Sequence, residues 1–223
     1  MLSVIVKGTN GCNLACSYCS LGRKTNVEKL SASKLYDIMK YASELCIRNN
    51  ENALNFILHG GEPTLISPST YEEAIVKIKK EYPNLKIHIL MQTNGYHISD
   101  EWVKFFNQYD VTVGISMDGS AEIHDKERRT LNHGKTFEKI KNNIYKLQEN
   151  HINVSCLMVL TSYALDEGFE FLKYFEQEQI HLKINPLLDY GEVYEHPELS
   201  LQAGQYADYI IKLYEYMLTS GID

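Results

Sequence analysis

The chain has 223 residues, 44% of them hydrophobic and 23% charged, and its 29 acidic and 22 basic residues give a net charge of −7. These proportions are those of a folded globular protein and exclude disordered, collagen-like and low-complexity chains. The acidic balance, with no cluster of Lys or Arg, argues against nucleic-acid binding, and no stretch approaches the roughly 20 apolar residues of a membrane span.

Six short β-rich runs alternate with helical patterns. The runs cover residues 3–9, 53–59, 86–92, 111–116, 153–160 and 181–185. Amphipathic spacing predicts a helix around residues 35–46, and a second around residues 71–78 behind a capping box of Ser69 and Glu72. A third helix is predicted from about Ser99, and three more carry the apolar sets Phe137, Ile140, Ile144 and Leu147, then Phe169, Leu172 and Phe175, then Tyr206, Ile210, Leu213 and Met217.

This alternation predicts an α/β fold of parallel strands, either as an open doubly wound sheet or as a barrel. Polar or glycine-rich segments follow five of the six strands: TNGC, HGGEPT, QTNG, SMDG and NPLLDYG. Chemistry drawn from several successive strand ends is typical of a barrel mouth, whereas an open sheet concentrates it at one switch point. We therefore expect a curled barrel of six β/α units over about residues 1–190, followed by a final helix at about residues 200–219.

Three of the five cysteines lie close together in CNLACSYC, where Cys12, Cys16 and Cys19 have the spacing C-x3-C-x2-C. An odd number of cysteines fits poorly with a secreted disulfide framework and fits bound metal in a reducing compartment. The opening residues also lack the basic leader and long apolar run of a secretion signal. We therefore expect a cytoplasmic protein.

Three explanations of the triplet differ in what the thiols bind. Offsets of four and seven would align three buried thiols on one helical face, although the neighbouring Gly11 and Asn13 favour a loop. Structural zinc requires four ligands, and Cys46 and Cys156 fall on helix and strand patterns where a core role is expected. Three thiolates fit a 4Fe-4S cluster that leaves one iron open for a substrate or cofactor.

The chain resembles the radical S-adenosylmethionine (radical SAM) enzymes, and most closely the branch of anaerobic sulfatase-maturating and other peptide-modifying (SPASM-type) members. The resemblance rests on CNLACSYC, HGGEPTL, QTNGY and VGISMDGSAEIHDKERR, which occur in the family's order within about the first 130 residues. It implies a partial (β/α)6 TIM-like barrel of the radical SAM type, with one 4Fe-4S cluster on the three cysteines. It also implies an oxidoreductase that cleaves S-adenosylmethionine (SAM) to a 5′-deoxyadenosyl radical, which abstracts hydrogen from a peptide or protein side chain. A flavodoxin or ferredoxin would supply the electron.

The resemblance places SAM against residues of two motifs. Tyr18, just before the last cysteine, matches the position where the family places an aromatic residue against adenine. The backbone carbonyls of Gly60 and Gly61 match those that hold the methionyl amino group, which glycine permits because it has no Cβ. Glu62 either helps to bind that ammonium group or caps its own loop.

Two later segments match the rest of the SAM site. Ser116 and Arg128 correspond to the serine and arginine that bind the methionyl portion, and a guanidinium suits a carboxylate. The neighbouring Arg129 is the alternative to Arg128. Leu187, after the sixth strand, is placed against adenine by analogy.

Three other polar residues belong to the predicted mouth. Asn94 and Asp118 either touch the ligand or fix their own turns. His59 is expected to be part of the polar framework and not a metal ligand.

Members of this branch usually continue into a cysteine-rich extension that holds auxiliary clusters and, in sulfatase-maturating members, a catalytic base. The chain stops near Asp223 without such cysteines, so we expect a radical SAM core over residues 1–223 with the auxiliary domain absent from this chain. It is then either a barrel fragment or a single-cluster enzyme. The catalytic residue on the substrate side and the bond that is made therefore stay unassigned. The alternative function is an iron–sulfur or zinc module without radical chemistry, which would not need the glycine-rich and Ser/Arg segments at the strand ends.

Overall fold

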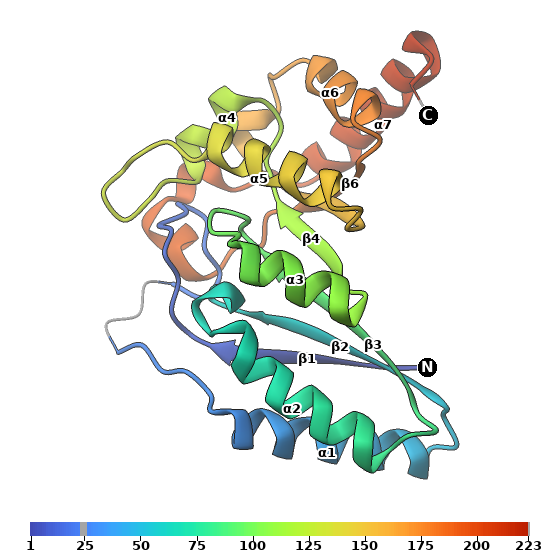
Figure 1. Cartoon of the computed structure of the whole chain (residues 1–223). Coiled ribbons are helices and arrows are strands. Elements are labelled where there is room, and N and C mark those ends of the chain that lie inside the picture. The colour runs from blue at the N-terminus through green and yellow to red at the C-terminus, as the bar shows by residue number, and fades with distance from the viewer. Residues whose placement is uncertain (23–25, 223) are drawn as a thin grey trace.

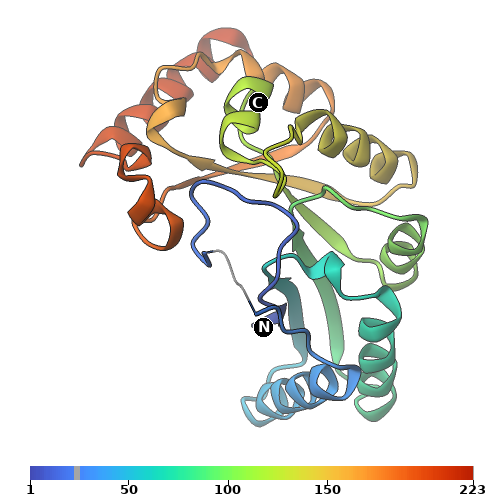
Figure 2. The ribbon, with the colours of Figure 1, turned by 90° about the vertical axis from the view of Figure 1, so that its left-hand side faces the viewer.

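The computed structural model describes residues 1–22 and 26–222. Its six strands form one parallel sheet in the order β1-β2-β3-β4-β5-β6, so every strand pairs with its neighbours in the chain. The strands are β1 (Leu2–Thr9), β2 (Ala53–Gly60), β3 (Lys86–Thr93), β4 (Thr112–Ser116), β5 (Val154–Leu160) and β6 (His181–Pro186). Figure 2 shows the sheet curled into an open arc with the helices outside it. Within the described residues β6 does not pair with β1, so the predicted partial barrel is confirmed.

The connections supply the outer layer of the arc (Figure 1). Its α-helices are α1 (Ala32–Arg48), α2 (Pro68–Glu81), α3 (Asp100–Tyr109), α4 (Ala121–Glu127), α5 (Phe137–Glu149), α6 (Leu172–Gln177) and α7 (Gln205–Ser220). Short 3-10 turns occur at η1 (Pro63–Leu65), η2 (Ser162–Ala164), η3 (Phe169–Phe171), η4 (Gly191–Glu195) and η5 (Pro197–Leu199). No helix within the described ranges is both long enough and apolar enough to cross a bilayer.

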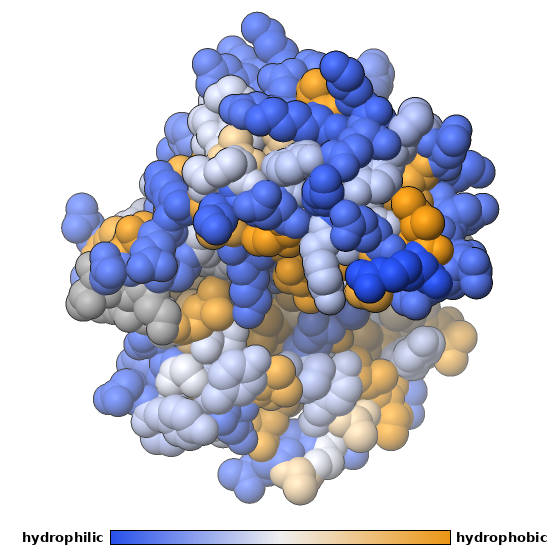
Figure 3. Space-filling view, turned by 90° about the horizontal axis from the view of Figure 1, so that it is seen from below, coloured by the Kyte–Doolittle hydropathy of each residue, from blue (hydrophilic) through white to orange (hydrophobic). Residues whose placement is uncertain are grey.

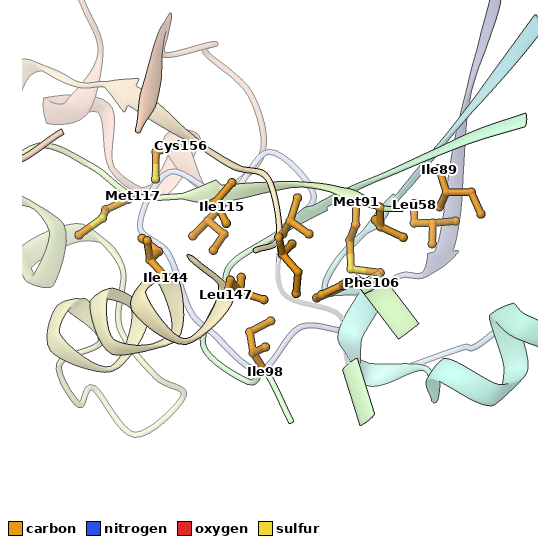
Figure 4. Close-up of a cluster of buried hydrophobic side chains, with 14 of the residues drawn as sticks. Leu58, Ile89, Met91, Ile98, Phe106, Ile115, Met117, Ile144, Leu147 and Cys156 are labelled. Carbon is orange, nitrogen blue, oxygen red and sulfur yellow. The ribbon is translucent and has the colours of Figure 1, made fainter. Parts of the chain in front are cut away.

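The hydrophobic core lies between the outer face of the sheet and these helices. Along β2 every second residue is buried, with Leu54, Phe56 and Leu58 fully so, because successive side chains of a strand point to opposite faces. Figure 4 shows part of this core, where side chains from the strands meet those of α3 and α5. Cys46 and Cys156 are both buried in it, as their helix and strand patterns predicted.

Three local details differ from the sequence predictions. The second helix is capped by Ser67 and not by Ser69, because Pro68 occupies its first turn and the Ser67 hydroxyl accepts from the Thr70 N–H. The predicted helix around residues 169–175 begins as a 3-10 turn and becomes α6 only at Leu172. The short helix α4 was not predicted, since its seven residues are too few to display a hydrophobic period.

Candidate cofactor site

The three clustered cysteines lie on the loop that follows β1. Cys12, Cys16 and Cys19 are free thiols, each partly exposed, and the loop is not helical. The alternative of three thiols buried on one helical face is therefore wrong. The thiols are presented from extended and turn backbone at the carboxyl end of the sheet.

A backbone clamp holds this loop against a segment more than a hundred residues further along the chain. The N–H of Ala15 donates to the carbonyl of Arg129 (2.7 Å), and the N–H of Ser17 donates to that of Glu127 (3.0 Å). The pairing is antiparallel, and it fixes the stretch between the first and third cysteines at the end of α4.

Burial disfavours the ionised form of two thiols of this loop. Burial raises the pKa of Cys12 and raises that of Cys16 to about 12. The guanidinium of Arg128, whose Nη1 lies 3.8 Å from the Cys16 sulfur, opposes the second shift, whereas the other two thiolates add to it. Among the described residues, no three Cys, His, Asp or Glu side chains surround a point that would hold a single metal ion. The donor set of three soft sulfurs on one loop suits an iron–sulfur cluster, in which each thiolate binds a different iron.

The glycine pair at the end of β2 brings a second turn against the cysteine loop. Gly61 N–H donates to the Thr9 carbonyl, and Glu62 N–H donates to the Gly11 carbonyl, each at 2.8 Å. A Cβ on Gly60 would lie 2.3 Å from the Thr9 oxygen, and one on Gly61 would lie 2.1 Å from the Gly11 oxygen. These two positions therefore require glycine because the backbone at the end of β1 and at the start of the cysteine loop approaches them closely.

We expect Gly61→Ala to displace the cysteine loop, since backbone at that distance cannot give way as a flexible side chain does. The variant should lower both the melting temperature and the iron bound after reconstitution, measured by thermal denaturation and iron analysis. The matched control is Gly168→Ala, because a Cβ there meets nothing within 4 Å. Equal iron content in the two variants would contradict this role of Gly61.

Glu62 joins the ends of β2 and β3 beneath the loop. Its carboxylate is fully buried and accepts from the Thr64 N–H (3.0 Å), the Thr64 hydroxyl (2.7 Å), the Thr93 hydroxyl (2.6 Å) and the Asn94 N–H (2.8 Å). The Asn94 side chain in turn donates to Asn13 Oδ1 at 2.8 Å and lies 3.6 Å from the Cys12 sulfur. The structure thus brings Glu62 and Asn94 together behind the first cysteine.

Asp118 is the centre of a second buried group. Its carboxylate accepts from the Tyr18 hydroxyl, from Arg128 Nε (2.6 Å) and from the Val159 N–H (3.0 Å). The Arg128 guanidinium also lies over the Tyr18 ring, 5.1 Å from its centroid. These contacts link the ends of β4 and β5 to the cysteine loop, because Arg128 reaches Cys16 from the same position.

The other predicted residues fall at separate places around this centre. Leu187 packs with Tyr18, so the two residues predicted to lie against adenine share one small apolar cluster. Ser116 accepts from Gln92 Nε2 at 3.2 Å, and no hydrogen bond joins it to Arg128 among the described residues. Arg129 is exposed and donates from Nε to the Asp125 carbonyl of α4 (2.9 Å), so the side chain that points into the site is that of Arg128.

Sequence reasoning missed two residues that position this machinery. Gln92 donates a hydrogen bond to Ser116. The Gln92 side chain packs against Gly114, where an added Cβ would lie only 2.4 Å from Gln92 Oε1. The period-2 alternation along β3 was the available signal for Gln92. His124 Nδ1 accepts from the Asp118 N–H at 3.2 Å, and burial lowers its pKa to about 4, so the ring is neutral. Nothing in the sequence spacing indicates this pairing.

Glu127 is a buried carboxyl group beside the same centre. One oxygen accepts from the Thr161 hydroxyl, and the other has no hydrogen-bond partner within the described residues. Burial, with the nearby charge of Asp118, raises the pKa of Glu127 from 4.5 to about 8. Because the folded state holds this proton more tightly than the unfolded state, Glu127 removes stability as pH rises from about 4.5 to about 8.

We expect Glu127→Gln to be more stable than the parent above pH 8, by roughly 2 kcal/mol or more, and to match it near pH 5. The amide has the shape of the protonated acid and does not ionise. Urea denaturation of both proteins at the two pH values measures the difference. A stability difference that is the same at both values would contradict the raised pKa.

The profile of the Radical SAM superfamily matches residues 6–175. The chain belongs to the radical SAM superfamily. The matched region includes the cysteine loop, the glycine turn and the Asp118 centre, so all three are parts of a radical SAM domain.

Similar proteins of this superfamily include two types of maturase. The chain is 31% identical over 231 aligned residues to a cysteine-type anaerobic sulfatase-maturating enzyme of Clostridium novyi (strain NT), covering 100% of this chain and 61% of that protein. It is 28% identical to a serine-type enzyme of the same name from Bacteroides thetaiotaomicron, covering 84% of this chain and 47% of that protein. This chain thus spans about 60% of the length of the first of these relatives.

Solved structures agree on the fold. Native anSMEcpe with bound AdoMet has a TM-score of 0.83 at 26% identity, covering 99% of this chain and 62% of that one. Streptococcus suis SuiB bound to the precursor peptide SuiA has a TM-score of 0.71 at 15% identity, covering 100% and 47%, and this likeness concerns the fold alone. The radical SAM barrel predicted from the sequence motifs is therefore confirmed.

Proposed function

We propose that this chain is the core of a radical SAM enzyme that modifies a side chain of a peptide or protein. Cys12, Cys16 and Cys19 would hold one 4Fe-4S cluster, with one iron left for SAM. When bound, the reduced cluster would supply one electron to the sulfonium of SAM, whose C–S bond would cleave to methionine and a 5′-deoxyadenosyl radical able to take a hydrogen atom from the substrate. The observation that carries the proposal is the set of three free thiols on one loop, held between the glycine turn and the end of α4.

The chain's own residues would bind and orient SAM around that loop. Ser116, oriented by Gln92, and Arg128, oriented by Asp118, would bind the methionyl carboxylate, because a hydroxyl and a guanidinium both donate to carboxylates. The carbonyls of Gly60 and Gly61 would accept from the methionyl ammonium. Within the described residues the Arg128 side chain donates from Nε to Asp118 and from Nη1 to Cys16, which leaves Nη2 for the carboxylate.

The remaining predicted residues would complete the pocket. Tyr18 and Leu187 would form the adenine side, since they already share an apolar cluster. Asn94 would separate the first cysteine from the ligand, and Glu62 would support the ammonium site through the turn that it fixes. We extend the radical SAM core over residues 1–223, and we assign no residue as the base on the substrate side.

A peptide or protein substrate is supported by the names of similar proteins. Sulfatase-maturating enzymes act on proteins, and one anSMEcpe structure, 28% identical, holds both AdoMet and the Cp18Cys peptide. The electron would come from a flavodoxin or ferredoxin. Free thiols of this kind suit a reducing compartment, and we place the enzyme in the cytoplasm.

The test is anaerobic reconstitution with iron and sulfide, followed by dithionite and SAM. We expect broad absorbance of an iron–sulfur cluster and formation of 5′-deoxyadenosine, measured by chromatography. Iron uptake without SAM cleavage would favour the metal-binding module instead. A colourless protein with no iron would overturn both functions.

A further inference from the structure

The inner face of the sheet is strongly one-sided in charge. The strand registers align its residues in rows: Lys7 pairs with His59, Asn55 with His88, and Leu157 with Lys183. The residues that point to this face are Ser3, Ile5, Lys7, Asn55, Ile57, His59, Lys86, His88, Leu90, Gln92, Thr112, Gly114, Ser116, Ser155, Leu157, Val159, His181, Lys183 and Asn185. They include three lysines and three histidines and no Asp or Glu, in a chain whose acidic residues outnumber its basic ones.

These lysines are available to a ligand. Lys7, Lys86 and Lys183 are exposed, and none of them has an ion-pair partner within the described ranges. Within the described residues the four lysines that form ion pairs all lie on helices of the outer layer, and two of them, Lys40 and Lys77, bind carboxylates of α2. Uncompensated cations within a concave surface focus the electrostatic field and attract anions.

The same face offers apolar contact between its cations. Ile5 is 58% exposed, and Ile57, Leu90 and Leu157 lie with Lys183 around a hollow of about 340 Å³. Seen from below, the molecular surface shows apolar patches around a shaded recess (Figure 3). Phe, Tyr and Trp are absent from the inward strand positions given above, so the face lacks the stacking platforms that single-stranded nucleic acids use. Lysines interleaved with aliphatic side chains fit an extended peptide that alternates acidic and apolar residues.

Carboxylates do occur at the mouth, on the segment that follows β6 and at Glu28, which lines a hollow together with Lys7. Asp189 accepts from the Ser200 hydroxyl, and Glu198 lies beside His196. An acidic stretch would be repelled there and attracted deeper along the strands, so the charge pattern gives the bound peptide a direction.

We propose that the inner face of the barrel binds an anionic segment of the peptide substrate, and that Lys7 and Lys183 select it. This inference rests on the proposed function, because it identifies the substrate class of the same site. The reacting side chain lies at the mouth near the cysteine loop, and the acidic segment lies along the lysines.

The test measures binding of labelled peptides to the full chain by fluorescence anisotropy, with and without the reconstituted cluster. The probes are matched peptides that alternate glycine with Glu, with Gln or with Lys, together with a short oligothymidine. We expect the Glu peptide to bind at least about fivefold more tightly than the Gln peptide, and its affinity to fall as salt is added. Lys183→Glu, alone or with Lys7→Glu, should abolish this preference.

The matched control is Lys80→Glu, which makes the same charge change on the outer helix α2, where Lys80 is exposed and has no ion pair among the described residues. It should leave the preference intact, and circular dichroism checks the fold of each variant. Equal binding of the Glu and Gln peptides, no binding of any peptide up to about 1 mM, or an equal loss in Lys80→Glu would overturn the inference. Oligothymidine binding as tight as that of the Glu peptide would overturn it in favour of nucleic acid. The assay needs no SAM cleavage, so a parent protein that forms 5′-deoxyadenosine but shows no preference for the Glu peptide would reject this inference alone.

Discussion

Replacing Cys16 by alanine is expected to abolish cluster absorbance and to lower 5′-deoxyadenosine formation by at least about a hundredfold, since catalysis is routed through a group that the protein no longer holds. Cys16 is the middle of the three thiols and the one that Arg128 contacts, so its loss would remove both a proposed iron ligand and the sulfur that faces the cation. The backbone clamp runs through Ala15 and Ser17, so it does not depend on the thiol. The variant should therefore remain folded. Iron analysis, absorbance and chromatography of the SAM products measure the effect.

Cys156→Ala is the matched control for this variant. Cys156 is buried in the core, 2% exposed, and lies on β5 away from the cysteine loop. Its removal should lower stability by about 1 kcal/mol through lost packing while iron and SAM cleavage stay near those of the parent. Retention of the cluster in Cys16→Ala, or its loss in both variants, would remove Cys16 from the proposed ligand set.

Removing the Asp118 carboxylate is expected to cost about 3–5 kcal/mol of the free energy of unfolding. Asp118→Ala leaves the buried Arg128 charge without its partner, and it also orphans the Tyr18 hydroxyl and the Val159 N–H. A loss of this size is a large part of the roughly 5–15 kcal/mol that stabilises a typical domain. Urea denaturation of the parent and the variant measures it.

A double variant separates the structural role of this pair from its proposed role toward SAM. Arg128→Ala alone would leave Asp118 as a bare buried charge, so weak SAM binding in that variant could follow from damage to the fold. Asp118→Asn with Arg128→Met removes both charges and keeps an oxygen that can accept from Val159. This double variant should recover most of the stability and still fail to bind SAM in equilibrium dialysis. Unchanged SAM affinity would show that Arg128 does not bind the carboxylate, and an Asp118→Ala protein as stable as the parent would refute the structural role.

Most of the architecture was accessible from local sequence. The six strands were predicted to within about two residues, because a buried parallel strand needs a short apolar run and each connecting helix needs an apolar stripe. The errors fell where those signals are weak. Helix α4 is short, and at the start of α2 two serines compete for the cap, a choice settled by Pro68.

The chemistry of the site divides in the same way. The spacing of the cysteines along the sequence was enough to identify the triplet, and the order of the four motifs predicted the radical SAM barrel. What only the tertiary structure decided is how these motifs meet: the clamp of the cysteine loop on the end of α4, the choice of Arg128 over Arg129, and the gathering of Tyr18, Arg128 and Val159 on Asp118. The period of the apolar residues indicates which side of a helix or strand is buried. It does not indicate the hydrogen-bond partner of a buried polar group, because that partner can come from any part of the folded chain. Arg128 lies only 10 residues from Asp118, but Val159 lies 41 and Tyr18 lies 100 residues from it, and Arg128 lies 112 residues from Cys16. These longer separations are beyond the reach of any local pattern.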